Sequence, residues 1–179
     1  MKCVPIESIA GVRVIVPPAA SFDTRGDFVK VPTVDGFQPV ETFCTISRKN
    51  VIRGMHFQTP PHAHAKLIAC ITGKVADVLV DLRRTSETYL CHSVMVLDAQ
   101  SPKFVFIPWG IAHGFRSLRE DTTMLYQTNT AHTPAHDTGI RWDSFGHDWR
   151  CWGTVEPVLS ARDREFPTLH GYHSPFPFA

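Results

Sequence analysis

The sequence has 179 residues, of which 43% are hydrophobic and 20% charged, and this suits one globular domain spanning residues 1–179. Lys and Arg total 18 against 17 Asp and Glu, so the chain lacks the strong positive field expected of a nucleic-acid partner. No apolar stretch reaches the roughly 18 residues that cross a bilayer, and the N-terminus lacks a signal-peptide core. We therefore expect no membrane segment and a cytoplasmic location.

Short extended segments dominate the chain, each rich in β-branched or aromatic residues and bounded by Gly, Pro, Asn or Asp. In chain order they cover residues 12–17, 41–47, 66–71, 74–83, 89–98, 103–108 and 122–130. One short helical candidate, residues 159–166, lies near the C-terminus. This pattern predicts an all-β fold, either a sandwich or a jelly roll.

The segment 74–83 has the clearest alternation. Its even-numbered residues Ala76, Val78, Val80 and Leu82 share one face, and Asp77 lies on the opposite, half-polar face. A half-polar face predicts a sheet that lines a cavity. The sequence ITGK, residues 71–74, predicts a turn that joins 66–71 and 74–83 into an antiparallel hairpin.

The stretch RGMHFQTPPHAHAK, residues 53–66, concentrates histidines and allows several interpretations. His62 and His64, beside two prolines, could be polar loop residues without a role. A metal site could instead combine His62, His64 and His113, as in the His-x-His and later His of the cupin motifs. The Glu that follows His-x-His in those motifs is absent here, and Lys66 in its vicinity would repel a dication.

The third interpretation is acid–base chemistry without a metal. Arg53, His56 and Gln58 lie in a run that leads toward an apolar strand, where polar side chains need partners. The motifs SFDTRGDF, NVIRGMHFQ, KLIACITGKVADVLVDLR, FVFIPWGIAHGF, MLYQTNT, GIRW and LSARD follow one another along the chain. In this order they resemble the dTDP-4-dehydrorhamnose 3,5-epimerase family over most of the sequence.

This resemblance implies an all-β, cupin-like jelly-roll β-sandwich with short C-terminal helical segments, and a homodimer with strand exchange. It also implies an isomerase without metal or cofactor. Its substrate would be a nucleotide-diphosphate-linked 4-keto-6-deoxyhexose, epimerised at C3, C5 or both. The C4 ketone acidifies the neighbouring C–H bonds, so a base can form an enolate that is reprotonated on the other face.

The resemblance also suggests the catalytic residues. His56 is the expected base, Asp163 its carboxylate partner, Lys66 the stabiliser of the enolate and Tyr126 the acid on the opposite face. The substrate-binding candidates are Arg25, Phe28, Lys30, Arg53, Gln58, Asp77 and His113, with Arg53 gripping the diphosphate. Taken singly, each has an ordinary structural alternative: Tyr126 as a core residue, Lys66 as an exposed edge lysine, Asp163 as a helix cap.

Some residues depart from the family pattern. Lys30 stands where the family usually has a Glu that reads thymine, and Glu41 and Phe43 stand where it commonly has Gln and Asn. A lysine only donates hydrogen bonds, which suits a base that presents acceptors, and this predicts CDP rather than dTDP. Ala131 and His132 occupy positions near which the family often carries aromatic residues that pack on the sugar, and this leaves a single-centre epimerase as an alternative. A metal-dependent cupin enzyme and a binding protein without turnover are further alternatives.

Overall fold

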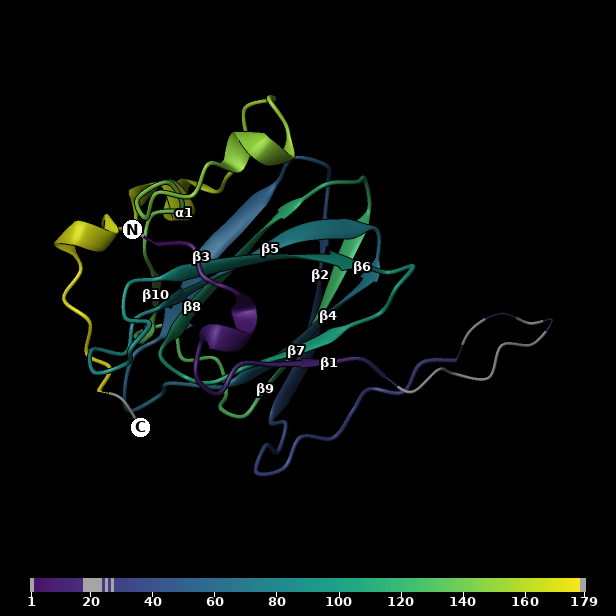
Figure 1. Cartoon of the computed structure of the whole chain (residues 1–179), viewed down its shortest axis with the longest axis horizontal. Helices are drawn as coiled ribbons and strands as arrows, with labels where there is room; N and C mark the ends of the chain where they lie inside the picture. The colour runs from purple at the N-terminus through teal and green to yellow at the C-terminus, as the bar shows by residue number, and fades with distance from the viewer. Residues whose placement is uncertain (1, 18–23, 25, 27, 178–179) are drawn as a thin grey trace.

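The computed structural model describes residues 2–17, 24, 26 and 28–177 and forms a β-sandwich of two five-stranded sheets (Figure 1). One sheet has the strand order β1-β7-β4-β9-β2 and the other the order β10-β3-β8-β5-β6. Neighbouring strands pair antiparallel in both. The predicted all-β fold class is therefore confirmed.

The first sheet consists of β1 (Arg13–Ile15), β7 (Phe104–Ile107), β4 (Lys66–Thr72), β9 (Thr122–Thr128) and β2 (Glu41–Ser47). The second consists of β10 (Asp137–Gly139), β3 (Ile52–Gln58), β8 (Ile111–Ser117), β5 (Lys74–Asp81) and β6 (His92–Asp98). The short helical segments are η1 (Ile6–Ser8), η2 (Trp149–Trp152), α1 (Ala161–Glu165) and η3 (Leu169–Gly171). All seven predicted extended segments contain a strand, and α1 confirms the predicted C-terminal helix. Among the described residues, no helix is long and apolar enough to span a membrane.

The predicted hairpin between β4 and β5 is wrong. β4 pairs with β7 and β9, whereas β5 pairs with β6 and β8 in the other sheet. The turn at Gly73 therefore carries the chain from one sheet to the other. Both strands are apolar on the side that faces the partner sheet, and Ile68 of β4 and Leu79 of β5 share one core cluster. Packing face to face buries these side chains between the sheets.

The predicted alternation in β5 is confirmed, but both faces of the strand are buried. Val75 and Leu79 belong to the cluster between the sheets. Val78 and Val80 belong to a second cluster that includes Phe145, Trp149 and Phe176. The C-terminal segment thus covers the outer face of this sheet, and Asp77 faces inward, toward the space between the sheets.

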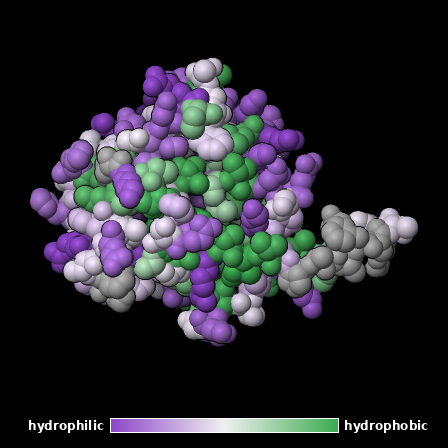
Figure 2. All heavy atoms as spheres, viewed as in Figure 1, coloured by the Kyte–Doolittle hydropathy of each residue, from purple (hydrophilic) through white to green (hydrophobic). Residues whose placement is uncertain are grey.

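Of the described residues between β1 and β2, 16–17, 24, 26 and 28–33 form an arm that extends away from the body of the sandwich (Figure 1). Several apolar side chains in this region are exposed, including Val16 at 67%, Phe28 at 58% and Val31 at 43%. Figure 2 shows hydrophobic side chains on the surface where the arm leaves the body. β2, at the edge of its sheet, also exposes Phe43 and Ile46. Unpaired edges and exposed apolar residues of this kind are sites where another chain can pack.

Candidate active site

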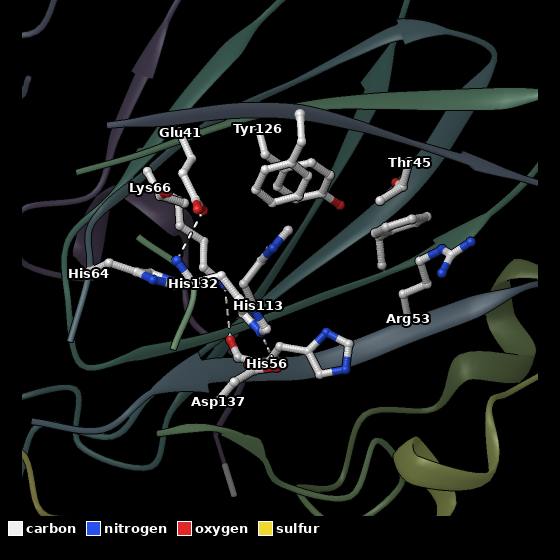
Figure 3. A pocket seen from close by; sticks show the side chains of 13 residues that line it. Glu41, Thr45, Arg53, His56, His64, Lys66, His113, Tyr126, His132 and Asp137 are labelled. Atoms are coloured by element: carbon white, nitrogen blue, oxygen red, sulfur yellow. Dashed lines mark hydrogen bonds and ion pairs between the residues drawn. The ribbon is translucent and has the colours of Figure 1, made fainter. Parts of the chain in front are cut away.

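A pocket of about 210 Å³ lies between the two sheets (Figure 3). Its walls come from β2, β4 and β9 on one side, from β3 and β8 on the other, and from the loop and strand that follow β9. The lining residues are Glu41, Phe43, Thr45, Arg53, His56, His64, Lys66, His113, Phe115, Tyr126, Thr128, His132 and Asp137. Five of the eleven predicted site residues line this pocket, namely Arg53, His56, Lys66, His113 and Tyr126.

His56 and Asp163 form a hydrogen-bonded pair at this pocket. His56 comes from β3, and Asp163 comes from α1, which begins after the N-cap Ser160; the Ser160 hydroxyl accepts a bond from the Asp163 N–H. The His56 Nε2 atom lies 2.8 Å from Asp163 Oδ1, and the N–H of Gly54 donates to Asp163 Oδ2 at 3.2 Å. Burial alone would raise the pKa of the Asp163 carboxyl, but the bonds from His56 and Gly54 hold it below its ordinary value.

This geometry determines the tautomer of His56. An ionised carboxylate only accepts hydrogen bonds, so the His56 Nε2 carries the proton that it donates to Asp163. The lone pair is then on Nδ1, which leaves this nitrogen as the basic atom of the ring. The ring of Phe166 packs edge-on against His56, with centroids 5.7 Å apart. The His56 side chain keeps 30% of its surface exposed, so it remains accessible to a ligand.

Lys66, the first residue of β4, is only 8% exposed. Its ammonium donates a hydrogen bond to the main-chain oxygen of His56 at 3.1 Å, which joins the two sheets at the pocket. Burial lowers the pKa of Lys66 to about 8, although Asp137 and Asp77 oppose this effect. The ammonium is therefore largely charged at neutral pH and can interact with a nearby anionic oxygen.

Tyr126 lies on β9, in the sheet opposite His56, and Figure 3 shows the two side chains on different walls of the pocket. Phe43 stacks on its ring with centroids 5.0 Å apart and an interplanar angle of 10°. Burial, with a contribution from Asp77, raises the pKa of the Tyr126 phenol well above its ordinary value. The phenol thus stays protonated and can serve as a proton donor.

His113 and Arg53 are two further polar residues of the pocket. His113 lies beside His56, because β8 and β3 pair them in register, and its Nε2 atom is 2.6 Å from Asp77 Oδ1. Both side chains of this second His–Asp pair are almost fully buried. The Arg53 guanidinium is exposed and oriented by hydrogen bonds to the Ser47 hydroxyl and the Ile46 carbonyl. An oriented, exposed guanidinium is well suited to a phosphate.

The remaining candidates are placed elsewhere. Gln58 is 1% exposed and lies outside the pocket lining, where it holds neighbouring loops. Phe28 and Lys30 lie on the exposed arm and do not line the pocket of their own chain. Arg25 lies outside the described residues.

The three histidines of the metal interpretation have separate partners. His62 Nδ1 bonds the Thr133 hydroxyl, His64 Nδ1 bonds Gln58, and His113 bonds Asp77. Within the part of the chain that the structure describes, no group of three His, Cys, Asp or Glu side chains is arranged to hold a metal ion.

One group of pocket residues was not predicted as part of the site. Glu41 Oε2 accepts a hydrogen bond from the His132 N–H at 3.0 Å, and His132 Nε2 lies 3.2 Å from Asp137 Oδ2. Arg162 pairs with the same Asp137 oxygen at 2.7 Å. These residues close one end of the pocket. Glu41 and His132 are recognisable in the sequence as departures from the family pattern, whereas Asp137 lies on a three-residue strand that no sequence pattern predicts.

Comparison with known proteins gives consistent matches. A family model described as dTDP-4-dehydrorhamnose 3,5-epimerase matches residues 7–171. The protein of that name from Mycolicibacterium smegmatis is 32% identical over 90% of this chain and 83% of its own. The solved structure of the Bacillus anthracis protein of that name, with TDP and diphosphate bound, is 30% identical, with a TM-score of 0.83 and coverage of 89% and 94%. A 3'-monoepimerase from Streptomyces bikiniensis in complex with dTDP-quinovose is 27% identical, with a TM-score of 0.84 and coverage of 95% and 88%.

The fold and these relatives define the chain as a cupin-like epimerase, an enzyme of the isomerase class. The predicted class of enzyme is thereby confirmed. The chain belongs to the dTDP-4-dehydrorhamnose 3,5-epimerase family, as the sequence motifs indicated.

Proposed function

We propose that this enzyme epimerises a nucleotide-diphosphate-linked 4-keto-6-deoxyhexose at C3, C5 or both, by proton transfer through an enolate and without a metal. The observation that carries the proposal is the 2.8 Å contact between His56 and Asp163 at a pocket whose opposite wall holds Tyr126. A base and an acid on opposite sides of a sugar ring are what inversion of a carbon centre requires.

The proposed reaction has two proton transfers. The Nδ1 atom of His56 takes the proton from the carbon next to the ketone, and the electron pair of that C–H bond moves toward the ketone oxygen as the enolate forms. The Lys66 ammonium stabilises the charge on that oxygen. Tyr126 then donates its phenolic proton to the other face of the carbon, and the electron pair returns from the oxygen. Solvent restores the protonation states of His56 and Tyr126.

Exchange in deuterated water tests the proposal. With a dTDP-linked 4-keto-6-deoxyglucose as substrate, we expect deuterium at C3, C5 or both, detected by NMR. His56→Asn should abolish the exchange while leaving the affinity for dTDP within about threefold, because the nucleotide contacts remain. Wild-type enzyme that binds the sugar nucleotide without incorporating label would instead indicate a binding protein. Stoichiometric zinc, iron or manganese in the active enzyme by elemental analysis would contradict the metal-free mechanism.

The nucleotide that the enzyme prefers can be identified by measuring its affinities for CDP and dTDP. The matched proteins named above are named for dTDP-linked sugars or hold TDP or dTDP-quinovose, which supports dTDP. The substitutions Lys30, Glu41 and Phe43 favour CDP by the hydrogen-bonding argument. Calorimetry should give tighter binding of CDP than dTDP in the wild type and a shift toward dTDP in Lys30→Glu. A clear wild-type preference for dTDP would remove the CDP alternative.

The number of centres epimerised is a separate question. The family includes enzymes named for two centres and, in the Streptomyces bikiniensis protein, for one. Ala131 and His132 stand near positions where the family often has aromatic residues that pack on the sugar, and their absence would favour a single-centre reaction. The count of deuterated carbons distinguishes the two, since a double epimerase labels both C3 and C5.

We also propose that two copies form a homodimer through the arm and the edge strand β2. The exposed apolar residues Phe28, Val31 and Ile46 support this assembly, because burying them removes apolar surface from water. Such a dimer would also give Phe28 and Lys30 a pocket to reach, that of the partner. Sedimentation at equilibrium should give twice the mass of the chain, and an active monomer would contradict the proposal.

A further inference from the structure

Gln58 has its side-chain amide fixed in one orientation. Its Oε1 atom accepts a hydrogen bond from the Thr133 N–H at 2.6 Å, and its Nε2 atom lies 2.9 Å from the His62 carbonyl and 3.3 Å from the Ala131 carbonyl. A main-chain N–H needs an acceptor, which the amide oxygen provides and the amide nitrogen does not. A main-chain carbonyl needs a donor, which the amide nitrogen provides and the amide oxygen does not. These three contacts therefore place the NH₂ group on the side of His64.

This orientation determines the tautomer of His64. The Gln58 Nε2 atom lies 3.0 Å from His64 Nδ1, so Nδ1 accepts and the proton of the neutral ring is on Nε2. Burial, followed by the Lys66 ammonium, lowers the pKa of His64 to about 3. The ring is therefore neutral at physiological pH, with an N–H donor at Nε2.

The His64 Nε2 atom is buried and has no hydrogen-bond partner among the described residues. His64 lines the same pocket as Lys66, His56 and Tyr126 (Figure 3). A buried N–H without an acceptor has lost its bond to water and gained none in return, which is destabilising. Such a donor in the wall of a ligand site therefore gains most from an acceptor supplied by the ligand.

Lys66 cannot be that partner. Its ammonium and the His64 Nε2–H are both donors, so neither can satisfy the other. The group that both can bind is an oxygen that only accepts, and a ketone that becomes an enolate is such an oxygen. A neutral imidazole that polarises a carbonyl is an established form of electrophilic catalysis.

We propose, on the basis of the function above, that His64 is a further catalytic residue, whose neutral Nε2–H donates to the ketone oxygen of the sugar beside the Lys66 ammonium. The Nε2 atom is shielded from solvent, and His64 lines the pocket together with Lys66 and with His132, whose side chain is 56% exposed. The donor strengthens its bond as the oxygen becomes negative, so it lowers the barrier more than it tightens binding.

The test compares His64→Phe, which keeps a ring without a donor, with His64→Gln, which restores an N–H. His64→Phe should lower kcat about 100-fold with KM and dTDP affinity changed less than about threefold, and His64→Gln should recover at least about tenfold of that loss. The matched control is His62→Phe, two residues away and outside the pocket lining, with kcat within about twofold of wild type. Equal kcat in His64→Phe and wild type, or no recovery in His64→Gln, would overturn the proposal.

A measurement on the unmodified enzyme gives a second, independent test. A proton–nitrogen correlation spectrum of ¹⁵N-histidine-labelled protein should show His64 as a neutral ring protonated at Nε2. A proton on Nδ1 would overturn the proposal even if the variants did not fold. Wild-type enzyme with this tautomer but without deuterium incorporation would refute the proposed epimerisation itself, so the two failures are distinguishable.

Discussion

Lys66→Met should make the protein more stable and inactive. Burial lowers the pKa of Lys66 from its ordinary value of 10.5 to about 8. Because a tenfold change in proton affinity corresponds to about 1.4 kcal/mol, holding the ammonium in the folded chain costs about 3 kcal/mol. The substitution also removes the bond to the His56 carbonyl, worth about 1 kcal/mol. The expected net gain in the free energy of unfolding at pH 7 is therefore about 2 kcal/mol.

The stability gained by Lys66→Met should become smaller as the pH rises. Above pH 10.5 the lysine is neutral in both the folded and unfolded states, so the cost is absent. As the pH falls from 10.5 through about 8, the unfolded chain binds the proton first, and the wild type loses stability relative to the variant. Below about pH 8 the full difference is present.

Urea denaturation followed by circular dichroism at pH 7 and at pH 10 measures this difference. The control is Lys49→Met, an exposed lysine whose replacement should change stability by less than about 0.5 kcal/mol. If Lys66→Met is less stable than wild type at pH 7, or if its advantage does not shrink at pH 10, the reasoning about the buried ammonium is refuted.

Four further predictions concern the site and the core. Asp163→Asn should lower kcat at least about 100-fold, because an amide no longer fixes the His56 tautomer; steady-state rates within threefold of wild type would contradict this. Tyr126→Phe should retain hydrogen exchange from the substrate but lower product formation about 100-fold, and NMR that finds normal product yield would exclude Tyr126 as the acid. Gly54→Ala should destabilise the chain by more than about 2 kcal/mol in thermal unfolding, since Gly54 has φ of +134° and an added Cβ would lie 2.5 Å from Gly114 Cα. Burial lowers the pKa of His147 to about 4, so wild-type stability should fall as the pH drops from 6.5 to 4, and this fall should be smaller in His147→Phe.

The strands that the sequence predicted and those that it missed differ in composition. The seven predicted segments are runs of β-branched and aromatic residues, and each contains a strand. β3 and β8 were not among them, because Gly54, His56, His113 and Gly114 interrupt the apolar pattern. These interruptions are where the pocket and the close approach of the two strands require polar or small residues. The demands of the pocket therefore hid the two strands that form one of its walls.

The candidate site was predictable where local motifs exist and not where distant segments meet. RGMHFQ and LSARD identified His56 and Asp163, and the structure brings these residues together across 107 positions. The contact between Glu41 and His132 spans 91 positions and depends on how β2 and the loop after β9 meet. No local pattern in either segment predicts that the two will be in contact. Likewise, the tautomer of His64 follows from a network around Gln58 that only the folded chain assembles.

His56 and Tyr126 belong to different sheets, and no single strand sets the distance between them. That distance is set by the side chains packed between the sheets, such as Leu79 and Met124, which do not line the pocket. The thickness of the core therefore sets the separation of the proposed base and the proposed acid. Removing a buried methylene there should cost about 0.5–1.5 kcal/mol of stability, and we expect the accompanying shift of the sheets to slow the proposed proton transfers as well.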